Sequence, residues 1–123
     1  AGTVHAMHDA TEGGLQGALC ELAESAGVRL DVDGASVPMR PGVEAVCDAL
    51  DLDPWTCTSA GTLLLAVDPE SVDTVEAAIS ARGTLVARIG TVRDGSGVYV
   101  DGDRVHPPDV DPSWQAFREL SRR

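Results

Sequence analysis

The chain contains no lysine and no asparagine, and only 3% of its residues are aromatic. Its 9 basic residues are therefore all arginines, and they are set against 20 acidic residues, which gives a formal net charge of −11. Without a basic stripe the sequence argues against binding to nucleic acid. An acidic, lysine-free surface is typical of a protein adapted to a high-salt cytoplasm, where salt screens the repulsion between acids. A GC-rich genome, which favours arginine and aspartate codons, would leave the same composition.

Long apolar runs and regularly spaced cysteines are also missing. No stretch approaches the roughly 20 apolar residues of a membrane span, and no signal region opens the chain, so we expect a cytoplasmic protein without a membrane partner. Cys20, Cys47 and Cys57 show no CxxC spacing, which argues against a disulfide framework and a zinc site. Cys57 is predicted in a loop and is the one cysteine worth testing as reactive.

The length and hydrophobic content predict a single domain over residues 1–123. Hydrophobic residues make up 43% of the chain, which suffices for a core, and the shortage of aromatics makes that core aliphatic. The chain opens with Ala1 in place of an initiator methionine and enters an expected strand almost at once. We therefore expect it to be a piece of a longer protein.

Hydrophobic periodicity predicts alternating strands and helices. The strands are expected at residues 3–8, 28–32, 62–67, 85–92, 98–100 and 104–105. The helices are expected at residues 11–26, from 41 to before Asp53, from 69 to before Gly83, and from 112 to 120.

This order indicates an α+β fold. Its first part reads as the βαββαβ pattern of a ferredoxin-like, split βαβ core with an inserted helix, followed by a C-terminal hairpin and helix on a mixed sheet. Right-handed crossovers would place the helices that start near residues 11 and 69 on one sheet face. The apolar run 63–67 predicts a strand covered on both faces. Trp114 and Phe117 are expected to pack on the sheet, with a partner-docking face as the alternative.

The stretch MHDATEGGL, residues 7–15, forms the turn between the first strand and the first helix. Gly13 and Gly14 permit close approach to the backbone and positive φ angles. The first amides of a helix lack intrahelical partners, so this turn could bind a small anion such as phosphate. Asp9 and Thr11 could help to position that ligand and its metal. A capped helix with a tight turn would require the same residues.

Two histidines near this turn raise the question of a metal site. His5 and His8 point to opposite faces of a strand because their spacing is odd, and only His5 and Asp9 share a face. We therefore predict no metal site formed by this domain alone, and expect these histidines to hydrogen-bond near a cleft.

Four stretches of the chain resemble one family in kind and in order. They are MHDATEGGL and residues 22–54, 58–70 and 87–100, so that the likeness covers roughly residues 4–105. They resemble the C-terminal domain of the aminoimidazole-ribonucleotide-synthetase (AIR synthase) superfamily, which includes hydrogenase-maturation carbamoyl dehydratase, selenophosphate synthetase and thiamine-monophosphate kinase. The resemblance is strongest to the hydrogenase-maturation branch.

The resemblance implies a two-domain, ATP-dependent parent enzyme that uses Mg²⁺. Its N-terminal domain would carry most of the metal- and nucleotide-binding residues and form a homodimer. The C-terminal domain would close over the nucleotide, with Asp9, Thr11, Gly13 and Gly14 facing the phosphates or the phosphorylated substrate. The shared chemistry is ATP-dependent activation of an oxygen atom, which depends on positioning and charge neutralisation. No catalytic residue is assigned in this chain.

The chain also departs from the family pattern. The maturation dehydratase carries its modified group on a terminal cysteine, whereas no cysteine follows Cys57 here. Relatives often have an acidic residue in a second loop, where this chain has Ala60 between Ser59 and Gly61. Ser59 and Gly61 are therefore candidates for that second loop of the site.

Two functions remain open from the sequence. The first is a domain of an ATP-dependent synthetase-like or dehydratase-like enzyme that acts together with a missing N-terminal domain. The second is a non-enzymatic, ferredoxin-like module that binds a small anion or a partner subunit.

Overall fold

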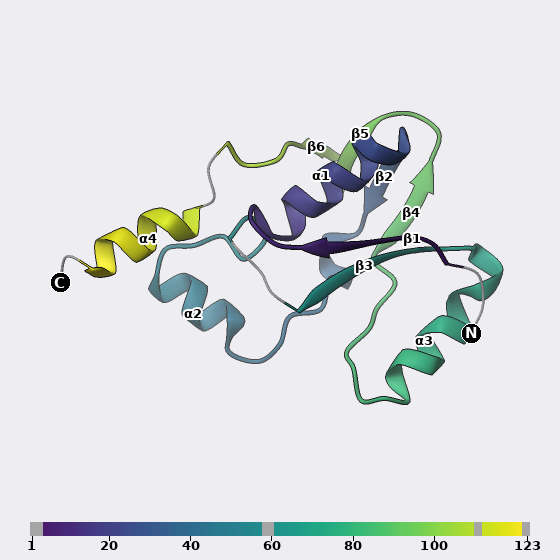
Figure 1. Ribbon diagram of the computed structural model, residues 1–123, viewed down its shortest axis with the longest axis horizontal. Coiled ribbons are helices and arrows are strands. Elements are labelled where there is room, and N and C mark those ends of the chain that lie inside the picture. The colour runs from purple at the N-terminus through teal and green to yellow at the C-terminus, as the bar shows by residue number, and fades with distance from the viewer. Residues whose placement is uncertain (1–3, 58–60, 110–111, 122–123) are drawn as a thin grey trace.

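The fold is built around one central helix that covers parts of two sheets (Figure 1). The computed structural model describes residues 4–57, 61–109 and 112–121. Helix α1 (Gly14–Ala26) contacts strands of both sheets. It ends where Gly27 adopts the left-handed conformation with φ of 66°, as its sequence position predicts.

The two sheets differ in size and in strand direction. Strands β1 (Val4–Ala10) and β3 (Thr62–Val67) form an antiparallel ribbon. The second sheet has the order β4-β2-β5-β6 and is mixed, because β2 runs antiparallel to β4 and parallel to β5. Its strands are β2 (Arg29–Val32), β4 (Gly90–Arg93), β5 (Gly97–Val100) and β6 (Asp103–Val105).

The core is small and aliphatic, as the composition predicts. It forms where one face of α1 meets the inward residues of the strands, for example Leu19 against Leu30 and Val98. In β2 the buried residues alternate with partly exposed Arg29 and Asp31, which is the period of a half-buried strand. The full cluster comprises Ala10, Ala18, Leu19, Ala23, Leu30, Val32, Leu64 and Val98.

The α+β class is confirmed, but the strands do not form the single sheet that a split βαβ unit would require. Among the described strands, β1 pairs with β3 alone, in an antiparallel ribbon, while β2 lies in the other sheet between β4 and β5. Strand β4 is also shorter than expected, because the residues from 85 to 89 have no regular structure. Pairing is decided by contacts distant in sequence, which local periodicity does not encode.

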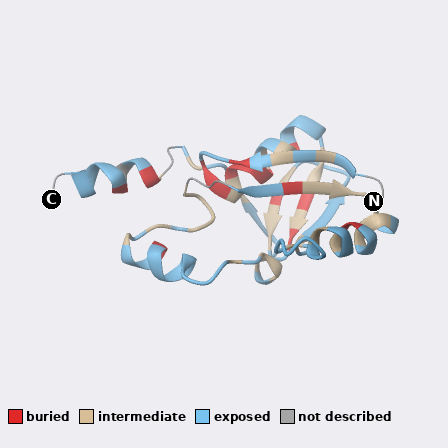
Figure 2. Ribbon diagram, turned by 60° about the horizontal axis from the view of Figure 1, so that its bottom comes forward, coloured by how far each residue is buried: buried red, intermediate tan, exposed pale blue. Residues whose placement is uncertain are grey.

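The remaining helices stand at the edge of the molecule (Figures 1 and 2). They are α2 (Val43–Ala49), α3 (Val72–Ser80) and α4 (Pro112–Ser121), with short 3₁₀ turns at Gly34–Ser36 and Pro69–Ser71. Trp114 and Phe117 of α4 are each 48% exposed, so the expected packing of α4 on the sheet is wrong. On α3 the expected inward residue Val75 is buried. Within the described ranges, no helix is both long and apolar enough to cross a bilayer.

Candidate phosphate- and substrate-binding turn

The turn between β1 and α1 depends on two consecutive glycines. Gly13 has φ of 78° and Gly14 has φ of 63°, so both adopt the left-handed conformation that side chains disfavour. The amide of Gly14 donates a hydrogen bond of 3.0 Å to the carbonyl of Thr11, which closes the turn. Asp9 and Thr11 remain exposed at the end of β1, whereas both glycines are buried.

The glycines are buried because the loop before β3 lies over the start of α1. A Cβ atom on Gly14 would collide with the carbonyl oxygen of Cys57 and would lie 2.7 Å from that of Trp55. The Trp55 carbonyl also accepts a 2.8 Å hydrogen bond from the amide of Gln16. Gly14 therefore allows protein backbone to approach the helix, a role that the sequence alone did not separate from ligand binding.

Most of the first amides of α1 donate hydrogen bonds to carbonyl groups of the chain itself. Those of Gly14, Gln16 and Gly17 donate to the carbonyls of Thr11, Trp55 and Gly13, respectively. An anion pocket built from these three amides is therefore not available in this conformation. No side chain caps this helix either, so the expected alternative of an Asp9 or Thr11 cap is also wrong. What the turn offers to a ligand is its exposed side chains.

Strand pairing brings the second loop to the same place. The β1–β3 register joins Asp9 to Leu63 and Ala10 to Thr62, so Gly61 follows next to Thr11. Gly61 is exposed, with φ of 82° and open space where a Cβ would be. Ser59, the other residue proposed for this loop, lies outside the described residues. The antiparallel register thus joins two segments that are about fifty residues apart in sequence.

The outer face of the β1–β3 ribbon is unexpectedly apolar and open. Met7 pairs with Leu65, and Asp9 pairs with Leu63, so these four residues share one face. Met7 is 63% exposed and Leu63 is 47% exposed, which contradicts the expected cover on both faces of β3. The continuous apolar run 63–67 was the signal for this face, but it could not reveal that one side of β3 is exposed among the described residues.

The side chains of His8, Cys20 and Cys57 have partners within the chain. His8 Nε2 lies 2.8 Å from Glu21 Oε2 on α1, which ties the ribbon to the helix. Burial is the main cause that raises the pKa of the Cys20 thiol; Arg104 lowers it and Glu21 raises it. The Cys57 thiol donates a 3.8 Å hydrogen bond to the Pro54 carbonyl. Among the described residues, no three His, Cys, Asp or Glu side chains are grouped so that they could hold a metal ion.

A hollow of about 470 Å³ lies on the outer face of the four-stranded sheet. It is open to solvent and is lined by charged groups that pair with one another. Asp31 accepts from Arg29 at 2.9 Å and from Arg93 at 2.6 Å. The Arg29 guanidinium lies 3.8 Å from the centre of the Tyr99 ring. These contacts stabilise the sheet surface and leave the β1–α1 turn as the candidate site.

Comparison with known proteins agrees with this fold. Residues 1–103 match the family described as AIR synthase related protein, C-terminal domain. The chain belongs to this family. It is 41% identical over 91 residues to carbamoyl dehydratase HypE of Rhizobium leguminosarum bv. viciae, a match that covers 72% of this chain and 26% of that protein. HypE of Escherichia coli K12 is 34% identical over 101 residues, covering 80% of this chain and 30% of the relative.

Solved structures of family members show the same architecture. A crystal structure of E. coli HypE superposes with a TM-score of 0.80 at 29% identity, covering 91% of this chain and 37% of that one. A structure of hydrogenase maturation protein HypE in complex with ATP gives a TM-score of 0.79 at 26% identity, covering 89% and 37% of the two chains. The chain therefore spans about a third of the length of these relatives.

Proposed function

We propose that this chain is the C-terminal domain of an ATP-dependent enzyme related to HypE, and that its β1–α1 turn faces the nucleotide phosphates or a phosphorylated substrate. Asp9 and Thr11 are the side chains that would contact this ligand, with Gly61 completing the rim. Ser59, outside the described residues, stays a candidate from the sequence alone. Gly13 and Gly14 serve by shaping the turn and admitting the covering loop. The reaction class is ATP-dependent activation of an oxygen atom, by phosphoryl transfer or by dehydration through a phosphorylated intermediate.

The single observation that carries this proposal is the convergence of two loops at the end of β1. The antiparallel register brings Gly61 beside Thr11 at an exposed corner where Asp9 is also exposed. Membership of the family and the likeness to a relative crystallised with ATP supply the ligand class. Exposed loop residues held by a rigid scaffold are well suited to bind and orient phosphate groups.

The described residues could supply only part of the ligand set of an Mg²⁺ ion. Asp9 supplies one exposed carboxylate, and Mg²⁺ commonly uses one or two carboxylates together with water and substrate phosphates. When bound, the ion would neutralise phosphate charge. The remaining protein ligands would have to come from the rest of the parent protein.

The apolar outer face of the β1–β3 ribbon supports a partner domain. An exposed apolar patch on a two-stranded ribbon is unfavourable unless another surface covers it. We propose that the N-terminal part of the parent chain provides this cover, and that the parent is a homodimer.

The test combines this chain with the rest of its parent, encoded by the same reading frame. Asp9→Asn and Thr11→Val should each lower ATP turnover by about tenfold or more, because each removes a ligand or a hydrogen bond that positions the phosphates. Glu12→Gln is the matched control, since Glu12 is an exposed neighbour with no assigned role. Equal turnover in all three variants would contradict the proposed site.

Comparing the chain alone with the chain combined with the rest of its parent tests whether turnover needs both parts. The chain alone should show weak, Mg²⁺-dependent amide shifts with ATP at residues 9–11 and no turnover. Robust turnover by the chain alone would overturn the proposal. Equal responses to sulfate and ATP without any dependence on Mg²⁺ would favour the non-enzymatic anion-binding module.

A further inference from the structure

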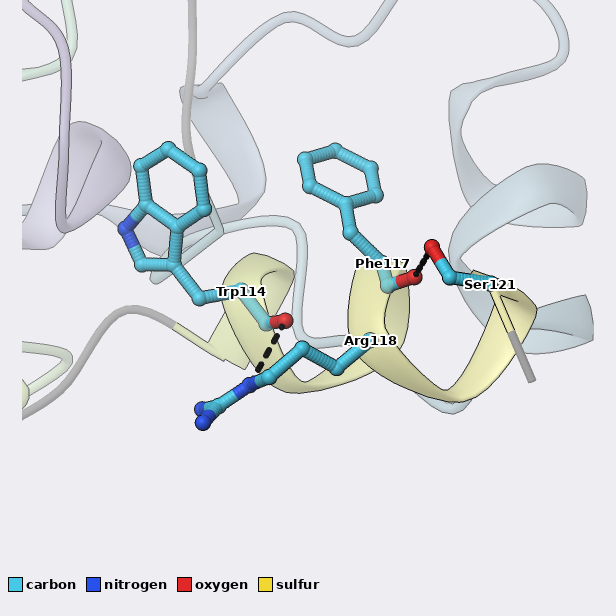
Figure 3. A pocket seen from close by; sticks show the side chains of 4 residues that line it. All are labelled: Trp114, Phe117, Arg118 and Ser121. Atoms are coloured by element: carbon cyan, nitrogen blue, oxygen red, sulfur yellow. Dashed lines mark hydrogen bonds between the residues drawn. The ribbon is translucent and has the colours of Figure 1, made fainter.

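Helix α4 lies beyond the part of the chain that matches the family and presents an aromatic face to solvent. The family match ends at residue 103, whereas α4 begins at Pro112. Trp114 and Phe117 are each 48% exposed and meet edge to face, with ring centres 6.1 Å apart. Figure 3 shows both rings on the same side of the helix, where they line a hollow of about 550 Å³ with Arg118 and Ser121.

Helix α2 presents a second exposed apolar stripe. Val46 is 58% exposed, and Val43, one turn earlier on the same face, is also exposed. Ala45 and Ala49 lie on the other side of Val46, and their small side chains permit close approach of another helix. Neither α2 nor α4 packs extensively on another element of the described chain.

The charges of the two segments are complementary. The sequence from 112 to 123 carries three arginines and one glutamate, whereas the sequence from 43 to 53 carries four acids and no base. Viewed from the N-terminus of α4, Arg118 lies clockwise from the aromatic stripe. Viewed in the same way along α2, Glu44 lies clockwise from the valine stripe. Antiparallel packing of the two helices would therefore bring Arg118 and Glu44 to the same edge.

The segment before α4 is fastened to the body of its own chain. Gln16 Nε2 donates a 2.6 Å hydrogen bond to the His106 carbonyl. A Cβ built on Gly13 would lie 3.5 Å from Cγ of Pro108, so this proline rests against the glycine turn. These contacts hold residues 106–108, and Figure 1 shows α4 extending away from the central helix. Because Trp114 and Phe117 are also exposed, their face is open to an occupant from another molecule.

We propose that α4 docks antiparallel on α2 of a second copy of this chain, in a reciprocal dimer. Each copy then contributes the aromatic face of its α4 to one contact and the valine face of its α2 to the other, as two-fold symmetry requires. The two contacts together bury an area on the order of 1,000 Å², at the lower end for specific complexes. The dimer therefore forms reversibly with concentration.

Sedimentation equilibrium of the full chain, at the lowest KCl concentration that keeps it folded, tests this dimer. The wild type should dimerise in the micromolar to millimolar range. Trp114→Ala with Phe117→Ala, and separately Val46→Asp, should each weaken the dimer by about tenfold or more. A further variant, Arg118→Glu, reverses a charge of the proposed contact, and Arg82→Glu, a charge reversal beside α3, is its matched control. Circular dichroism checks that each variant is folded.

Charge exchange tests the choice of partner surface. Arg118→Glu and Glu44→Arg should each weaken self-association, because each places like charges together in both contacts. Mixing these two variants should restore a dimer, since one contact then has exchanged charges and the other is wild type. A wild-type chain that stays monomeric, dimers that survive the α4 or α2 variants, or a mixture that fails to associate would each overturn the proposal. If a single chain that carries both Arg118→Glu and Glu44→Arg regains wild-type stability but stays monomeric, α4 closes on α2 of its own chain and the dimer proposal is overturned.

Discussion

The centre and the edge of this molecule satisfy their apolar surfaces in different ways. Around α1, Leu19, Leu30 and Val98 bury one another, so this region completes its core within the chain. At the edge, α2, α4 and the outer face of the β1–β3 ribbon leave apolar side chains exposed. The proposed partner surfaces would cover this exposed edge, whereas the buried centre supplies the stability of the isolated chain.

The largest expected effect separates these two regions directly. Leu19→Ala removes a side chain that is 3% exposed and should lower the free energy of unfolding by about 3 kcal/mol, because it leaves a cavity. Leu120→Ala on α4, where the leucine is 44% exposed, should cost less than about 1 kcal/mol. Urea denaturation of the two variants at a concentration where the chain is monomeric measures both values. Equal costs would contradict the division into centre and edge.

A second test concerns the two ends of α1. Gly14→Ala should cost at least about 2 kcal/mol, because a Cβ would meet the Cys57 carbonyl in addition to the strain of a positive φ. Gly27→Ala is the matched control, since φ is 66° there but nothing lies within 4 Å of the added carbon, and it should cost about 1 kcal/mol. Thermal unfolding of both variants measures the difference. If Gly14→Ala proves the milder change, the covering loop does not rest on this glycine.

Salt provides the smallest effect and tests the acidic surface. Repulsion within a chain of net charge −11 should weaken as salt is added. The melting temperature should rise by about 5–10 °C between dilute buffer and molar KCl, roughly 1–2 kcal/mol for a domain of this size. Differential scanning calorimetry at several KCl concentrations measures the slope. A flat profile would leave genome composition as the reason for the missing lysines.

The candidate site could be predicted only in part. The glycine pair identified the turn, because consecutive left-handed residues have few other solutions. The hydrogen-bond acceptors of the nearby amides could not be predicted. The amide of Gln16 donates to the carbonyl of Trp55 in a loop that sequence periodicity does not describe. The meeting of Thr11 with Gly61 likewise depends on strand register, which joins residues far apart in the chain.

The sequence by itself determined the α+β class, the end of α1 at its glycine and the alternation in β2, because these follow from backbone preferences and from periods of a few residues. The start of α1 was expected at Thr11 and lies at Gly14, because the glycine turn occupies the residues between. Only the tertiary structure decided that β1 and β3 form a ribbon of their own and that α4 stands away from the sheet. The physical reason is that strand partners and helix docking are chosen by long-range burial. Where part of the covering surface lies outside the chain, apolar stripes that the sequence assigns to a core are left facing solvent.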